Sequence, residues 1–342
     1  MTRHIRAGIL GAGFISDYHI EGLLSAGADV VSIYSRSEQN ARKKASQHGI
    51  AHSCNDVSEL LARQDIELVV IATPDFTHEE LAVAAAGAGK AILLQKPMAR
   101  SSDEAKRIVQ AADQAGAPLF VSFMHRYFEE VAAMRELLGQ DMLGTIQMVR
   151  QRNATPGAGW ADWFYDKEQC GGVVMQLGVH GIDLLRYLFG EIEAVKSATR
   201  SSGDERTLAD GTRVRPDNDD LAAAIYRLSS GVTATHEMSY REAAGTDRFR
   251  MEIYGDLGTA WLRTEKGRLA YCIPGPNQLE VWVAPSLPDP GFGKRHHEHV
   301  LAMLRGEAPL DSSAQDGVAA LLAAEAIYRS ASSGHWTPVT TI

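Results

Sequence analysis

Residues 5–16 read Ile5-Arg6-Ala7-Gly8-Ile9-Leu10-Gly11-Ala12-Gly13-Phe14-Ile15-Ser16, a short apolar strand followed by a glycine turn and the start of a helix. In such a turn Gly11 permits the tight bend, and Gly13 lets the backbone approach a pyrophosphate that the N–H groups of the helix N-terminus bind. Ser16 replaces the third glycine of the usual Gly-x-Gly-x-x-Gly pattern, so an ordinary strand-to-helix turn stays open as an alternative. A second strand begins about 20 residues further on, where the adenosine ribose would be held, and favours a dinucleotide site. The cofactor-binding candidates in this turn are Gly11, Gly13, Phe14 and Ile15.

The first third of the chain continues this alternation of strands and helices. We expect strands over residues 5–10, 30–34, 68–72, 91–94 and 119–123, and helices over 15–26, 37–48, 76–88 and 101–115. The strands at 68–72 and 91–94 are continuously apolar, as parallel strands buried on both faces are. The pattern predicts a doubly wound α/β domain whose ligand lies at the carboxyl ends of its strands.

After residue 123 the pattern changes to longer alternating strands punctuated by glycines. We expect strands over 145–153, 194–200, 221–228, 232–240, 248–254 and 259–263, and helices over 172–189, 298–304 and 313–330. This series predicts a large mixed or antiparallel sheet covered by a helix. We therefore expect a Rossmann domain over residues 1–124 and an α+β domain over 125–342, whose last helix can pack back on the first domain.

Composition narrows the classes of partner. The formal net charge of −9 argues against nucleic acid or an anionic membrane as a partner. No apolar run reaches the ~20 residues of a membrane helix, and the chain runs from Met1 into a strand without a secretion signal. The three cysteines, Cys54, Cys170 and Cys272, are far apart and look like reduced thiols. We expect a cytoplasmic protein.

Four motifs follow one another along the chain. They are the glycine turn at 11–13, Thr73-Pro74-Asp75-Phe76-Thr77-His78, Gln95-Lys96-Pro97, and Gly171-Gly172-Val173-Val174-Met175-Gln176-Leu177-Gly178-Val179-His180-Gly181-Ile182-Asp183. Together they resemble the Gfo/Idh/MocA family of NAD(P)-dependent oxidoreductases, and the resemblance extends to Glu252–Thr259 and Glu325–Ser330. It implies a small carbohydrate-type substrate and a homodimer or homotetramer formed through the C-terminal sheet.

Lys96 is the first catalytic candidate. It follows a buried strand and precedes a proline, so we expect it to project into the ligand crevice, where an ammonium can hydrogen-bond a substrate hydroxyl. In the family the motif is Glu-Lys-Pro and its lysine is catalytic. Here Gln95 holds the glutamate position; it can still bond a ribose hydroxyl but adds no charge. The resemblance also places Thr73, Pro74 and the terminal histidine, His78, at the nicotinamide half of the cofactor, although a strand-ending turn with a helix cap is an alternative there.

His180 is the second catalytic candidate, because an imidazole titrates near neutral pH and can accept a proton from an alcohol. Helical spacing places Gln176 one turn earlier on the same face. The family usually has Asp at the position of Gln176, so hydrogen bonding is kept here while the carboxylate is lost. Asp183 can contact substrate, orient the imidazole or cap a neighbouring turn.

Further positions complete the candidate site. Ser35 and Arg36 follow the second strand, where an acidic residue would bond the ribose 2′-hydroxyl; arginine and serine favour a 2′-phosphate, and so NADP over NAD. Arg36 can instead stack on adenine. Arg126 can bind an anionic substrate bidentately or form an interdomain salt bridge. Trp163, with Trp160 nearby, suits either a sugar-stacking loop or ordinary packing.

The segment His296-His297-Glu298-His299 invites a metal interpretation, but no further ligand with suitable spacing follows it. We expect no metal, and histidines that face the crevice or solvent. The whole sequence predicts an enzyme that transfers a hydride between NADP, or else NAD, and a secondary alcohol of a sugar, polyol or sugar acid. Two alternatives stay open: an isomerase or lyase that uses tightly bound NAD(P) transiently, and a nucleotide-sensing regulatory protein.

Overall fold

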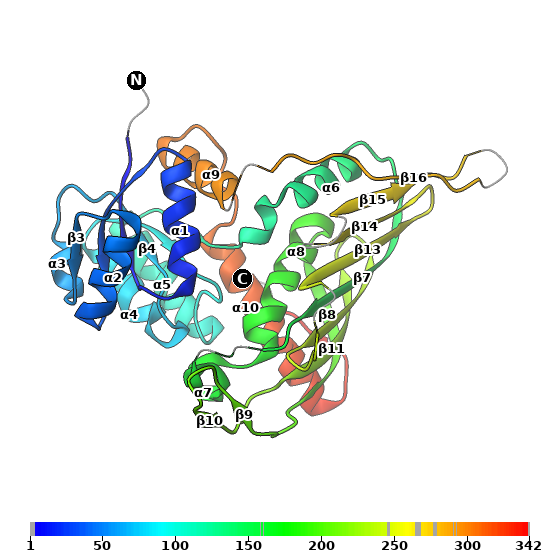
Figure 1. Ribbon diagram of the computed structural model, residues 1–342. Coiled ribbons are helices and arrows are strands. Elements are labelled where there is room, and N and C mark those ends of the chain that lie inside the picture. The colour runs from blue at the N-terminus through cyan, green and yellow to red at the C-terminus, as the bar shows by residue number, and fades with distance from the viewer. Residues whose placement is uncertain are drawn as a thin grey trace. The chain divides into compact units, whose positions relative to one another are not determined.

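The computed structural model describes residues 4–340 except 158, 160, 245–246, 264–267, 276–278, 290 and 292. The chain divides into two compact units, of which the first holds residues 1–124 and 289–318 and the second holds 125–288 and 319–342 (Figure 1). The sequence placed 289–318 with the second domain, whereas in the structure these residues pack with the first unit.

The first unit is built on a parallel six-stranded sheet with the order β3-β2-β1-β4-β5-β6. Its strands are β1 (Arg6–Leu10), β2 (Asp29–Tyr34), β3 (His52–Cys54), β4 (Leu68–Ile71), β5 (Ala91–Leu94) and β6 (Leu119–Val121). Chain order runs outward from β1 in both directions, so the carboxyl ends of β1 and β4 form the switch point where doubly wound sheets bind ligands. The predicted doubly wound domain is confirmed.

Helices pack on this sheet and end where their sequences dictate. They are α1 (Phe14–Ser25), α2 (Glu38–His48), α3 (Val57–Leu61), α4 (His78–Gly87), α5 (Ser102–Ala115) and α9 (Lys294–Arg305), with a 3₁₀ turn η1 (Asp75–Thr77). The side chains of Ser37 and Ser101 cap α2 and α5, and Gly49 and Gly116 end them in the left-handed conformation. Helices α1 and α9 lie side by side, although the chain separates them widely (Figure 1).

The second unit is built on a nine-stranded mixed sheet with the order β16-β15-β14-β13-β7-β12-β11-β8-β17. Its strands are β7 (Ile146–Ala154), β8 (Ile192–Arg200), β11 (Leu221–Leu228), β12 (Thr233–Ser239), β13 (Phe249–Gly255), β14 (Thr259–Arg263), β15 (Leu269–Cys272), β16 (Trp282–Val283) and β17 (Thr337–Pro338). A separate pair joins β9 (Arg206–Thr207) and β10 (Arg213–Val214). Only β7 and β12 pair in parallel within the described part of this sheet, and the predicted large mixed sheet is confirmed.

One face of this sheet carries helix α8 (Val179–Phe189) (Figure 1). The remaining helical segments are η2 (Met124–Tyr127), α6 (Glu129–Gly139), η3 (Asp162–Tyr165), α7 (Lys167–Cys170), η4 (Val174–Gly178) and α10 (Ala314–Ser333). A Cβ at Gly181 would stand 1.9 Å from Nε2 of Gln151 on β7, so the backbone of α8 approaches the sheet closely beside His180.

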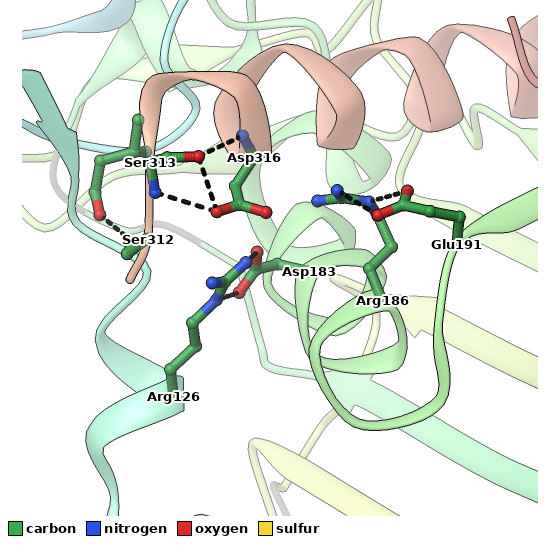
Figure 2. A network of polar contacts seen from close by, with 8 residues as sticks. Arg126, Asp183, Arg186, Glu191, Ser312, Ser313 and Asp316 are labelled. Carbon is green, nitrogen blue, oxygen red and sulfur yellow. Dashed lines mark hydrogen bonds and ion pairs between the residues drawn. The ribbon is translucent and has the colours of Figure 1, made fainter. Parts of the chain in front are cut away.

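Helix α10 begins in the first unit with a reciprocal cap (Figure 2). The backbone N–H of Ser313 donates to Asp316 Oδ2 at 2.9 Å, and the N–H of Asp316 donates to Ser313 Oγ at 3.2 Å. No helix among the described residues is long and apolar enough to cross a membrane.

Candidate functional site

The glycine turn between β1 and α1 has the geometry that a pyrophosphate requires. Gly11 has φ +117°, and a Cβ there would lie 2.5 Å from the carbonyl oxygen of Ala72, so only glycine fits. A Cβ at Gly13 would meet nothing within 4 Å. Gly13 is also the N-cap residue of α1 and has no side chain to occupy the helix N-terminus, so an anion can approach the N–H groups there. Ser16, at the third position of the motif, donates its hydroxyl to the Gly13 carbonyl at 2.5 Å. The turn therefore fits a dinucleotide.

The first helical residues and the end of β2 flank this turn. Phe14 is 62% exposed, while Ile15 packs partly buried against the core of the sheet. Ser35 donates its backbone N–H to Cys54 O at 3.2 Å, which anchors the end of β2. Arg36 is exposed, and its guanidinium makes no ion pair with the described residues. A cation at this position is available to an anionic ligand.

The turn after β4 is held by a buried histidine. The two ring nitrogens of His78 lie 3.0 Å from the carbonyl oxygens of Thr73 and Pro97. Burial lowers the pKa of His78 to about 4, so its ring is neutral at physiological pH. The hydroxyl of Thr77 donates within the turn, toward Thr73 Oγ1 and Pro74 O, both at 2.7 Å. His78 thus lies between the two backbone segments that the sequence assigned to the cofactor, and its neutral ring can donate to the carbonyl of Thr73 or to that of Pro97.

Lys96 follows β5 directly, at the carboxyl edge of the same sheet, and is half-buried. Its backbone N–H donates to Gln95 Oε1 at 3.1 Å. The Gln95 side chain is buried, and its Nε2 lies 2.6 Å from His19 Nε2 and 3.4 Å from Ser122 Oγ. The Gln95 amide is therefore engaged inside the first unit, beside the candidate catalytic lysine.

Two contacts join η2 to α8 in the second unit. The rings of His125 and His180 are stacked, with centroids 4.1 Å apart and planes 6° apart. Arg126 binds Asp183 bidentately, with Nε–Oδ2 at 2.8 Å and Nη2–Oδ1 at 2.5 Å, and both side chains are buried (Figure 2). Both residues of this salt bridge belong to the second unit. His125, which stacks on His180, was not among the predicted site residues.

The segment that precedes His180 is π-helical over Val174–Gly178. Gln176 lies inside this π segment and His180 in the α-helix that follows it, so the two residues are joined by an irregular helix rather than by a regular α-helix. Its Nε2 donates to the Cys170 carbonyl at 3.3 Å. Irregular helical turns of this kind often occur at functional sites.

A buried carboxylate holds the start of this segment. Asp219 accepts the N–H of Val174 at 3.1 Å and the hydroxyl of Tyr328 at 2.7 Å. Burial raises the pKa of Asp219. Sequence reasoning missed both residues, because Asp219 and Tyr328 are 109 residues apart.

Trp163 is half-buried in η3 and packs edge to face against Phe164, with ring centroids 5.7 Å apart. Trp160 lies outside the described residues. The Trp163 ring therefore packs against a neighbouring aromatic ring.

The histidines at the start of α9 face the interior, so the expectation that they face a crevice or solvent is wrong for His296 and His297. The cause is the packing of α9 on α1, where the Tyr18 hydroxyl lies 3.1 Å from His296 Nδ1. Gly22 of α1 leaves the space that His297 fills, since a Cβ there would be 2.1 Å from His297 Nδ1. Within the described ranges, no three His, Cys, Asp or Glu side chains form a group that could hold a metal ion.

Comparisons with known proteins agree with this architecture. A profile described as an oxidoreductase family with an NAD-binding Rossmann fold matches residues 5–123, and one described as a GFO/IDH/MocA C-terminal domain matches residues 131–261. Inositol 2-dehydrogenase of Rhizobium meliloti (strain 1021) is 27% identical over 339 residues, covering 95% of this chain and 96% of that protein. Levoglucosan dehydrogenase of Pseudarthrobacter phenanthrenivorans is 27% identical over 391 residues, covering 99% of each. A solved structure of levoglucosan dehydrogenase in complex with NADH and L-sorbose has a TM-score of 0.91 at 24% identity, covering 99% of this chain and 100% of that one.

Proposed function

The chain belongs to the Gfo/Idh/MocA family of NAD-binding oxidoreductases, and we propose that it interconverts a secondary alcohol of a sugar, polyol or sugar acid and the corresponding ketone, with NADP preferred over NAD. One observation carries the proposal: the carboxyl edge of a single parallel sheet bears both the glycine turn and Lys96. The relatives named for inositol and levoglucosan support the substrate class.

The residues of this edge suit the parts of a dinucleotide. The turn at Gly11 and Gly13, with the N-terminus of α1, would hold the pyrophosphate. The exposed cation of Arg36, with Ser35 beside it, would hold a 2′-phosphate, which an acidic residue would repel. The segment after β4 and Gln95 would flank the nicotinamide half. When bound, the nicotinamide ring supplies the site that gives or accepts a hydride.

The chain's own groups handle the proton and the charge on the substrate oxygen. His180 accepts the hydroxyl proton during oxidation, and the stacked His125 ring keeps its imidazole in one orientation. The ammonium of Lys96 donates a hydrogen bond to the oxygen as negative charge develops on it. Gln176 can orient a hydroxyl but cannot take a proton, so proton acceptance falls to His180.

A substrate screen tests the proposal. Inositols, hexoses, anhydro sugars and aldonates are each incubated with NADP+ and with NAD+, and reduced nicotinamide is followed by absorbance. We expect turnover with at least one of these substrates and a higher kcat/KM for NADP+. Consumption of a substrate without any change in nicotinamide absorbance would contradict a net oxidation.

Matched variants test the assigned roles. Lys96→Met and His180→Ala should each lower kcat by about 10²–10⁴-fold, the usual contribution of a group that handles a proton, while nucleotide binding is retained. The controls are Lys106→Met, whose ammonium is exposed and paired with Asp103, and His335→Ala, an exposed histidine. Near-normal kcat in Lys96→Met or His180→Ala would contradict that residue's role.

A further inference from the structure

A continuous chain of hydrogen bonds crosses the interior of the first unit and ends at Lys96. His297 Nδ1 lies 2.7 Å from the Gly293 carbonyl, and His297 Nε2 lies 2.9 Å from His19 Nδ1. His19 Nε2 lies 2.6 Å from Gln95 Nε2, and Gln95 Oε1 accepts the backbone N–H of Lys96 at 3.1 Å. The side chains of His19 and His297 are fully buried, and that of Gln95 nearly so. We call His297, His19 and Gln95 the histidine relay.

Backbone groups at its two ends fix the direction of every bond in the relay. The Gly293 carbonyl can only accept, so Nδ1 of His297 carries the proton and its Nε2 is an acceptor. His19 must then donate from Nδ1 and accept at Nε2, which requires a donor at residue 95. At the other end the Lys96 N–H can only donate, so residue 95 must also accept. A glutamine amide does both without carrying charge, whereas a carboxylate can only accept.

We propose that His297, His19 and Gln95 are positioning residues that hold the backbone of Lys96, and that the relay requires an amide at residue 95. This inference rests on the proposed function, in which Lys96 stabilises the substrate oxygen. It assigns a purpose to the histidine segment of α9, and it explains why glutamine stands where the resemblance has glutamate. Burial lowers the pKa of His19 well below its ordinary value, and the neighbouring His297 adds to this effect, in keeping with an uncharged relay.

A glutamate at residue 95 would complete the relay only by binding one extra proton, either on its carboxyl group or on His19. In an unfolded chain that carboxyl group loses its proton above a pH of about 4.3. Relative to the wild type, folding of the Gln95→Glu variant would therefore bind one more proton, and its stability relative to the wild type would fall as the pH rises. Among the described residues, the titratable groups beside the relay are Tyr18 of α1 and His296 of α9, which bond to each other, and the adjoining Lys96; all three are unchanged in the variant.

Urea unfolding from about pH 5.5 to about pH 8.5 tests the relay without substrate or nucleotide. Relative to the wild type, the folded-to-unfolded ratio of Gln95→Glu should fall about tenfold per pH unit. The Gln95→Leu variant binds no added proton, so its loss of stability relative to the wild type should not vary with pH. Tyr18→Phe removes a hydroxyl from the same cluster but leaves the relay intact. The pH dependence of its stability should therefore be parallel to that of the wild type. A Gln95→Glu profile parallel to the wild type would overturn the inference.

Turnover tests whether the relay positions Lys96. The kcat of Gln95→Glu, relative to the wild type, should recover as the pH is lowered and the extra proton binds, while the kcat of Gln95→Leu stays about tenfold or more below the wild type at every pH. A pH-dependent stability gap with an unchanged relative kcat would overturn the positioning role. Absence of wild-type turnover would contradict the proposed function instead, and the unfolding data would still decide the relay.

Discussion

The buried pair of Arg126 and Asp183 should make a large contribution to the stability of the second unit. The bidentate geometry, with bonds of 2.8 and 2.5 Å, gives two charge-assisted hydrogen bonds. The two side chains are 4% and 1% exposed, so water cannot replace a lost partner. Asp183→Asn keeps the shape of the side chain but removes the negative charge that binds the buried Arg126 cation bidentately. Breaking a buried pair in this way costs about 3–5 kcal/mol.

A second pair on the same helix provides the control. Arg186 of α8 pairs with Glu191, but Glu191 is 58% exposed (Figure 2). The Arg186 side chain is 7% exposed, but water reaches the pair from the exposed glutamate side, so Glu191→Gln should cost less than Asp183→Asn. The double variant Arg126→Met with Asp183→Leu removes both charges, so it should be less destabilised than Asp183→Asn.

Urea and thermal unfolding measure these differences. At about 2–4 °C per kcal/mol, Asp183→Asn should lower Tm by about 6 °C or more, and Glu191→Gln should lower it by less. If Asp183→Asn were no more destabilising than Glu191→Gln, burial would not be what gives the Arg126 pair its strength. If the double variant were the least stable of the three, the assumption that losing the Asp183 charge beside the buried Arg126 is costly would be refuted.

Three further changes test other parts of the molecule. Arg36→Asp should lower the ratio of kcat/KM for NADP+ to that for NAD+ by about 10–100-fold, the worth of one charge-assisted hydrogen bond; an unchanged ratio would remove Arg36 from the cofactor site. Tyr328→Phe leaves the buried Asp219 carboxylate short of one donor and should lower the free energy of unfolding by about 1–3 kcal/mol, measured in urea. Gly22→Ala places a Cβ 2.1 Å from His297 Nδ1, so Tm should fall even though alanine stabilises a helix by about 1 kcal/mol over glycine. A higher Tm would mean that His297 moves aside without cost.

The strands of the first unit could be predicted well because their signal is local. Strand β5, Ala91–Leu94, has the expected bounds, and β4 differs from expectation by one residue. Two short elements could not be predicted, β3 (His52–Cys54) and α3 (Val57–Leu61), because segments of three and five residues are too short to show a period. Residues 289–318 were predicted to belong to the other domain. No local sequence pattern indicates that α9 packs on α1.

The polar partners of the candidate residues could not be predicted from the sequence. His19 bonds to Gln95, 76 residues away, and to His297, 278 residues away, so no spacing pattern links them. Arg126 and Asp183 were each identified separately, but their pairing depends on how η2 packs on α8. Motif reading thus identified individual side chains, while the groups each one bonds to were set by tertiary packing.

The two glutamines that replace the family's usual acidic residues share one physical explanation. Gln95 donates to the Nε2 acceptor of His19, and Gln176 donates to the carbonyl of Cys170. At both positions a carboxylate would face a hydrogen-bond acceptor. It would repel that acceptor unless it bound a proton. Each amide therefore matches its local hydrogen-bond partners. Neither glutamine alters the roles proposed for Lys96 and His180. In a relative with glutamate at the position of Gln95, the hydrogen bonds must either reverse direction or include one more proton. We expect such a relative to differ at the position of His19 or His297 as well, which would allow the reversal.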